Sequence, residues 1–332
     1  MHNVTAQATL SSFLFICSVV CADSPPSLTQ RIAWNDNSNL DVVQDSQYSA
    51  EKGVAAVTAA FNHARREEET QLGLPANVIK DLILPKQEVW DTMSDDAKAL
   101  YLINDARTAR ADMMPGVLGL ALAGVESSFD LMVENYAILL HNTNAKGHYQ
   151  PSGNPAIDNP LARIQQDPYI GLKTRLNSAK KATKKIACYE SLARYENVAF
   201  FSGYSLGKAD ASTVPLPIER SIYNWIYNDA KSGWQYRQTV LLQDNGSIGK
   251  GFNNNNGDAQ HEGFLGFHRI SSANYTPFHV PEGVNGYGVV VVMGLLDPIA
   301  SNKKGAENCE YSISVRTEDL PVPEKTLIIS AN

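Results

Sequence analysis

Apolar residues recur at helical spacing in the first two thirds of the chain. Between residues 50 and 69, apolar positions three or four apart predict a helix with one buried face. Ser94, followed by two carboxylates, is typical of a helix start, and that helix should run to about Met113. A third predicted helix ends near His141. A fourth begins around Pro217, because proline is tolerated in a first helical turn.

The pattern changes in the second half of the chain, where short runs of β-branched and aromatic residues predict strands. Residues 289–293 are continuously apolar, which indicates a strand buried on both faces. Helices followed by strands favour an α+β fold in which the helices cover the sheet. The predicted strands are 198–201, 239–242, 263–269, 288–296, 311–315 and 326–329.

The N-terminal segment is typical of a secretory signal. Residues 10–22 are apolar but too few to span a bilayer, and Val20 and Ala22 suit a cut before Asp23. We therefore expect a signal peptide over residues 1–22, a polar flexible leader over 23–47, and a secreted or periplasmic protein. No later apolar run is long enough for a transmembrane helix.

Composition and cysteine count narrow the class further. The 332 residues include 28 Lys+Arg and 35 Asp+Glu, and the net charge of −7 argues against a general nucleic-acid binder. The one basic run, 173–185, is typical of a solvated loop. After signal cleavage only Cys188 and Cys309 remain, and they form either one disulfide or two separate buried thiols.

Four short polar motifs stand at the edges of predicted helices or strands. A fold that brings them together would place a histidine and two carboxylates in one cleft, where they can bind a divalent metal or exchange protons. They are Gly147-His148-Tyr149, Tyr195-Glu196-Asn197, Trp225-Ile226-Tyr227-Asn228-Asp229 and Gly233-Trp234-Gln235-Tyr236-Arg237.

Each motif has a candidate side chain and a simpler alternative. His148 lies in a predicted loop and is free to face a cleft, although a surface histidine fits equally. Glu196 precedes an apolar run, so its carboxylate must be paired, solvated or functional. Asp229 follows Trp225 by one helical turn and either projects beside the indole or ends the helix without a special role.

Two enzymatic hypotheses remain open. In the first, Glu196 activates water and His148 positions it or assists proton transfer, giving a hydrolase. In the second, Ser205 within residues 203–207 is the nucleophile of an esterase, because Gly-Tyr-Ser-Leu-Gly fits the G-x-S-x-G elbow. That elbow needs a helix after the serine, but residues 208–217 contain two prolines.

Taken in order, the four motifs resemble the CAP superfamily of secreted proteins: cysteine-rich secretory proteins, insect antigen 5 and plant pathogenesis-related proteins. The resemblance covers about residues 94–298 and is closest to bacterial exported members. Residues 102–107 resemble the family's opening helix, and 232–237 fall where the family has Gly-His-Tyr or Gly-His-Arg. Cys188 falls where bacterial relatives tend to have a cysteine, which favours a disulfide to Cys309. The implied organisation is a helical extension over 48–93, a CAP domain over 94–300 and a C-terminal strand extension over 301–332.

The resemblance implies a three-layer α-β-α sandwich with an antiparallel central sheet and a central cleft. In the family, two histidines and two acids of this cleft can bind a divalent cation. Here His148 and Glu196 match, Asp229 is a shifted and shorter acid, and Tyr236 cannot replace a neutral imidazole nitrogen. We therefore expect zinc or calcium to bind weakly, if at all, and the cleft to bind a lipid, sterol or glycan rather than to catalyse a reaction.

Overall fold

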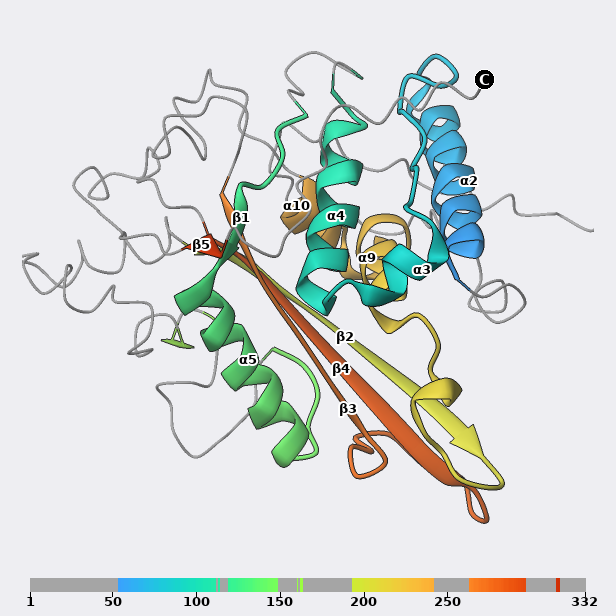
Figure 1. Ribbon diagram of the computed structural model, residues 1–332, viewed down its shortest axis with the longest axis vertical. Helices are drawn as coiled ribbons and strands as arrows, with labels where there is room; N and C mark the ends of the chain where they lie inside the picture. Colours follow the sequence, from blue (N-terminus) through green and yellow to red (C-terminus); the bar gives the residue numbers. More distant parts are fainter. Residues whose placement is uncertain are drawn as a thin grey trace, which may run out of the picture.

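The computed structural model describes residues 53–111, 113, 119–148, 160, 162–163, 193–241, 263–296 and 315–316. These residues form an α+β fold with one sheet, which confirms the predicted class (Figure 1). The signal peptide, the flexible leader, the basic run, Cys188, Cys309 and the predicted strand 326–329 lie outside the described residues. Among the described residues, no helix combines the length and apolarity needed to cross a membrane.

The sheet has the strand order β2-β4-β3-β1-β5. β2, β4 and β3 pair antiparallel, but β1 pairs with β3 in parallel, so the predicted antiparallel sheet is in fact mixed. β1 and β3 are far apart in the chain, with α5, β2, α9 and α10 between them, which gives the long connection that a parallel pair requires. The strands are β1 (Gly124–Glu126), β2 (Ala193–Ser205), β3 (Phe264–Ser272), β4 (Asn285–Leu296) and β5 (Val315–Arg316).

Helix α5 (Ser127–Asn142) packs along one face of β3 and β4. It lies close because Gly266 and Gly294 have no side chains: a Cβ on Gly294 would lie 2.6 Å from Cζ of Phe129. Asp130 of α5 also accepts a hydrogen bond from the backbone N–H of Phe267 at 2.8 Å, which satisfies a donor on β3. Packing and hydrogen bonding therefore fix α5 against the sheet.

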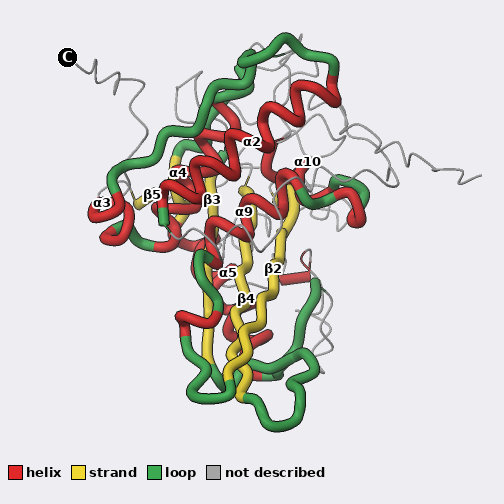
Figure 2. The backbone as a smooth tube through the Cα atoms, turned by 90° about the vertical axis from the view of Figure 1, so that its right-hand side faces the viewer, coloured by secondary structure: helices red, strands yellow, loops and turns green. Residues whose placement is uncertain are grey.

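The opposite face of the sheet is covered by a second group of helices (Figures 1 and 2). Val289, Val291 and Met293 of β4 belong to the hydrophobic core on this side, and all three are fully or almost fully buried. Val290 and Val292 alternate with them and are equally buried, so the predicted burial of this strand on both faces is confirmed. The remaining helices are α2 (Val54–Leu72), α3 (Gln87–Thr92), α4 (Asp95–Thr108), η1 (Ala211–Thr213), α9 (Pro217–Tyr227), η2 (Ala230–Ser232) and α10 (Gln235–Leu241).

Two local expectations were wrong. Residues 239–242 were expected to form a strand, but 239–241 are the last turn of α10, where contacts with α4 and α9 outweigh the β-branched sequence. Helix α9 ends at Tyr227, so Asp229 does not continue the face that carries Trp225. Helix α4 does begin after Ser94, but the Ser94 hydroxyl donates to the Asp96 carboxylate instead of capping the helix.

A buried ionic network joins α2 to the second group of helices. The carboxylate of Glu68 in α2 pairs with the guanidinium groups of Arg110 and Arg237, and all three side chains are fully buried. Arg110 also donates to the hydroxyl of Tyr227 at 2.9 Å, and Arg237 donates to the carbonyl of Ile226 at 2.8 Å. The negative charge of Glu68 and the hydrogen bonds to Tyr227 and Ile226 together offset part of the cost of burying the two guanidinium groups.

Candidate functional site

Glu196 lies near the start of β2, opposite Gly294 of β4. Cross-strand partners face the same side of a sheet, and Phe129 of α5 packs over Gly294, so Glu196 is on the α5 side. The side chain of Glu196 is only 8% exposed, and a carboxylate buried to this extent needs partners.

The first partner is His148, in the loop that follows α5. Its ring nitrogen Nδ1 lies 3.0 Å from Oε1 of Glu196. The preceding residue, Gly147, has a φ of 108°, a left-handed value that glycine adopts without strain. The loop is held by two tyrosines: Tyr136 donates to the carbonyl of Gly147 at 2.5 Å, and Tyr275 donates to the carbonyl of Ala145 at 2.7 Å.

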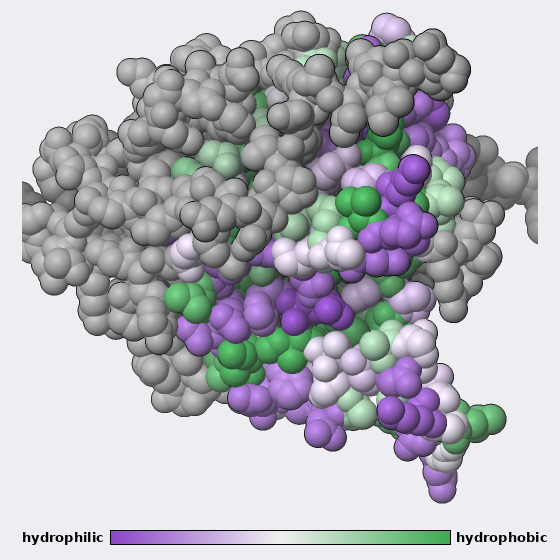
Figure 3. All heavy atoms as spheres, viewed as in Figure 1, coloured by the Kyte–Doolittle hydropathy of each residue, from purple (hydrophilic) through white to green (hydrophobic). Residues whose placement is uncertain are grey.

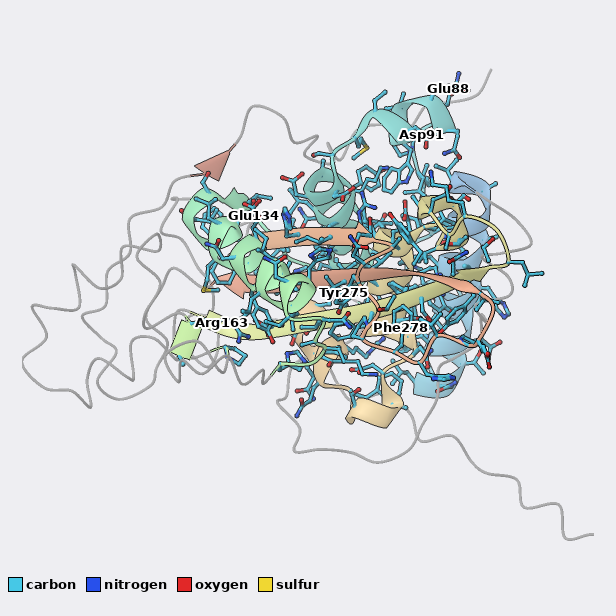
Figure 4. The ribbon with its side chains drawn as sticks, turned by 90° about the horizontal axis from the view of Figure 1, so that it is seen from below. Glu88, Asp91, Glu134, Arg163, Tyr275 and Phe278 are labelled. Carbon is cyan, nitrogen blue, oxygen red and sulfur yellow. The ribbon has the colours of Figure 1, made fainter. Side chains whose placement is uncertain are left out.

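The second partner of Glu196 is Arg163, which the sequence analysis did not identify. Its guanidinium pairs with Oε2 of Glu196, and its side chain is only 4% exposed. The guanidinium also lies over the ring of Tyr136, 3.4 Å from the ring centroid (Figure 4 labels Arg163). No motif surrounds this arginine in the sequence, so only the three-dimensional structure reveals it.

Tyr236 of α10 completes the group, with its hydroxyl 2.8 Å from Nε2 of His148. The two rings are tilted, with centroids 5.6 Å apart. Burial raises the pKa of Tyr236 to about 12, and the negative charges of Asp229 and Glu196 act in the same direction. The hydroxyl therefore stays protonated at neutral pH and is available as a donor.

The carboxylate, imidazole and hydroxyl groups determine the directions of these hydrogen bonds. Ionised Glu196 only accepts, so in a neutral imidazole Nδ1 carries the proton and Nε2 accepts from Tyr236. The chain Arg163–Glu196–His148–Tyr236, which we call the polar cluster, is thus connected from end to end. Of the three residues His148, Glu196 and Arg163, His148 is the most exposed. Its side chain is 24% exposed, against 8% for Glu196 and 4% for Arg163.

Asp229 lies outside the polar cluster. Its Oδ2 accepts a hydrogen bond from the backbone N–H of Arg237 at 2.9 Å, so it caps the first turn of α10. Burial raises its pKa to about 7, although hydrogen bonds from Arg237, Ser232 and Tyr236 partly oppose the shift. Among the described residues, Asp229 is bonded to the backbone of Tyr236 and Arg237 rather than to a side chain of the polar cluster, and the simpler alternative of a helix-end carboxylate describes its position.

The predicted metal ligands His148, Glu196 and Asp229 do not come together as one set. Within the described part of the chain, no group of three His, Cys, Asp or Glu side chains is placed to hold a metal ion. Both nitrogens of His148 are engaged by Glu196 and Tyr236, and the charge of Glu196 is already paired with Arg163. This donor set does not fit a resident zinc ion, which takes neutral imidazole nitrogens and unpaired carboxylates or thiolates.

Ser205 does not have the surroundings of a nucleophile elbow. It ends β2, and the chain continues through a bend to η1 rather than into an α-helix. Its hydroxyl accepts a hydrogen bond from the backbone N–H of Gly207 at 3.1 Å. Among the described residues, no histidine is hydrogen-bonded to Ser205, so the base that the esterase hypothesis needs is missing there.

On the face shown in Figure 3, hydrophilic residues predominate and are interrupted by small apolar areas. In Figure 4, Arg163 lies beside the start of β2, far from Glu88 and Asp91 of α3.

The comparisons with known proteins give no relative: no family model, no curated protein and no solved structure matches this chain. The contacts of the polar cluster are therefore the basis for a proposed function.

Proposed function

We propose that this chain is an exported CAP-domain protein, a three-layer α-β-α sandwich whose cleft at the polar cluster binds a small ligand of the lipid, sterol or glycan class. The order of the four motifs supports the family, as does a sheet with helices packed on both faces. Two residues of the segment that resembles the family's opening helix bond the chain just before β1. Asn104 exchanges two hydrogen bonds with the backbone of Leu122, and Arg107 donates to the carbonyl of Leu120 at 2.7 Å.

One observation carries the proposal: protein groups already satisfy both imidazole nitrogens of His148. The Arg163–Glu196 ion pair neutralises the only two permanent charges of the polar cluster. A neutral ligand with hydroxyl or carbonyl groups suits such a site better than a metal or a highly charged molecule, because it leaves no charge unpaired. The partly exposed His148 and Tyr236 are the groups that such a ligand would contact.

The test is a titration of the purified protein with three probes: a fluorescent sterol, a short-chain phospholipid and a soluble oligosaccharide. At least one probe should show saturable binding, and His148→Ala should weaken it by about tenfold or more, because the Tyr236 hydroxyl, whose oxygen can still accept from a ligand, would lose the imidazole that orients it. His141→Ala is the matched control, because His141 ends α5 and bonds Ser272 instead of the cluster. Absence of saturable binding, or equal affinities for the two variants, would reject the proposal.

A second candidate function is hydrolysis, and one observation favours it. Glu196, His148 and Tyr236 form a carboxylate–imidazole–hydroxyl chain, the order found in acid–base triads. Because Glu196 is paired with Arg163, His148 is the better base and Glu196 orients it. If Glu196→Gln abolishes a hydrolytic activity while probe binding persists, the protein is an enzyme. A fluorophosphonate that labels wild type but not Ser205→Ala would instead support the esterase hypothesis.

A further inference from the structure

Tyr136 has the position of an ordinary core residue. It lies in α5, on the buried stripe of the helix, and is 2% exposed. Its hydroxyl, however, donates to the carbonyl of Gly147 at 2.5 Å. Gly147 immediately precedes His148 and has a positive φ, so this bond fixes the backbone from which the imidazole projects.

The ring of Tyr136 makes a second, independent contact. The guanidinium of Arg163 lies 3.4 Å from its centroid, within the range of a cation–π interaction. The same guanidinium pairs with Glu196, and it also donates to the carbonyl of His148 at 3.4 Å. A planar cation held on an aromatic face has little freedom to rotate, so the ring limits where the Glu196 carboxylate is held.

We propose that Tyr136 is the positioning residue of the polar cluster: its hydroxyl places His148, and its ring places Arg163 and, through it, Glu196. Arg163 at one end of the cluster and His148 within it are thereby both held by helix α5. Phenylalanine would nearly fill the same core volume but would lack the hydroxyl contact, and leucine would be apolar but lack both contacts. The importance of this role rests on the proposed function, whereas the geometry stands without it.

The hydroxyl is suited to this role because it remains a donor. Burial raises the pKa of Tyr136, and the charge of Glu196 raises it further. The proton therefore stays on the phenol over the pH range in which the protein would work, and the bond to Gly147 persists.

The experiment uses the ligand-free protein with ¹⁵N-labelled histidine, observed by NMR. In wild type, the His148 ring should show a single tautomer with an exchange-protected Nδ1 proton, as the bond to Glu196 requires. Tyr136→Phe keeps the ring and removes the hydroxyl, so we expect the Nδ1 proton signal to broaden or disappear through faster exchange with water. Tyr136→Leu removes both contacts and should in addition give a mixture of tautomers.

The matched control is Tyr101→Phe. The Tyr101 hydroxyl also donates to a backbone carbonyl, that of Ile83 at 2.7 Å, but it lies on α4 away from the cluster. A comparable loss of thermal stability in both phenylalanine variants, with a changed His148 spectrum only for Tyr136, supports the proposal. An unchanged His148 spectrum in Tyr136→Phe would overturn it and leave Tyr136 as a core residue. Because no ligand is present, this result is separate from a failure of the probe titration.

Discussion

Glu196 and Asn197 are consecutive residues of β2 that reach the same site from opposite faces of the strand. Glu196 bonds the ring of His148, whereas Asn197 donates from Nδ2 to the backbone carbonyl of Tyr236 at 3.1 Å. Successive side chains of a strand alternate between its faces, so an acid–amide pair at this point fixes both α10 and the polar cluster.

We therefore expect Asn197→Ala to destabilise the protein by about 1–3 kcal/mol, because it removes the hydrogen bond that the fully buried Asn197 side chain donates to the carbonyl of Tyr236. The unfolding midpoint in urea measures the effect. Asn285→Ala is the control, since its amide also donates to a carbonyl, that of Gly207, but at an exposed position. Equal losses in the two variants would contradict a special role for Asn197.

Replacement of Glu68 by glutamine should be among the most harmful single changes. It leaves the buried guanidinium groups of Arg110 and Arg237 without a negative partner, and breaking a buried ion pair in this way costs about 3–5 kcal/mol. Glu67→Gln, one residue earlier and partly exposed, should have little effect. Similar stabilities of the two variants in chemical denaturation would show that the network contributes little.

The same carboxylate predicts an acid limit for stability. Burial alone would raise the pKa of Glu68, but the charges of Arg110 and Arg237 outweigh burial and lower it to about 2. An unfolded glutamate has a pKa of about 4.3, so the stabilising contribution is complete above that pH and is lost as pH falls toward about 2. Glu68→Gln should therefore lose less stability than wild type over this interval, as thermal melts at several pH values would reveal.

Asp229 predicts the opposite trend near neutral pH. Its folded pKa of about 7 exceeds the unfolded value of about 3.9, so the folded protein binds more protons between these values. The contribution of Asp229 to stability is thus complete below about pH 4 and declines as pH rises through about 7. Asp229→Asn keeps an acceptor for Arg237 and should flatten this decline between pH 5 and 8. Parallel pH–stability curves for wild type and variant would refute the assignment.

Tyr236→His tests why the cluster does not fit a metal. The change would set a second imidazole beside His148 and remove the hydroxyl that occupies Nε2. We expect calorimetry to show zinc affinity at least about 100-fold above wild type, which exceeds the usual effect of altering groups behind the ligands. Tyr236→Phe removes the same hydroxyl without adding a ligand and should gain nothing. Equal zinc affinity in all three proteins would mean that the Arg163–Glu196 pair, rather than Tyr236, prevents binding.

The elements with a strong apolar period could be predicted from the sequence, and the short elements could not. The apolar stripe before His141 predicted α5, and the proline at its start predicted α9. The continuously apolar residues 289–293 predicted β4, which is buried on both faces. β1 has three residues, too few to show a period, and its partner β3 lies far along the chain, beyond α5, β2, α9 and α10.

The candidate site divides in the same way. His148, Glu196 and Tyr236 were found because each belongs to a motif in a characteristic order, and the structure brings these three into contact. Arg163 lies in no motif, and Tyr136 has the spacing of an ordinary core residue, so their contacts depend on tertiary folding alone. Asp229 was grouped with them because it follows Trp225 by one helical turn. That spacing places two residues on one face only within a helix, and α9 ends at Tyr227.

The Glu68 network decides where a working fragment of this protein can begin. Helix α2 lies in the expected N-terminal helical extension over 48–93 and, among the described residues, supplies the only carboxylate paired with Arg110 and Arg237. A shorter version starting at Asp95 would enclose two positive charges with no counter-ion, directly behind the helix that presents Tyr236. Expression clones intended to retain the polar cluster should therefore start upstream of Val54.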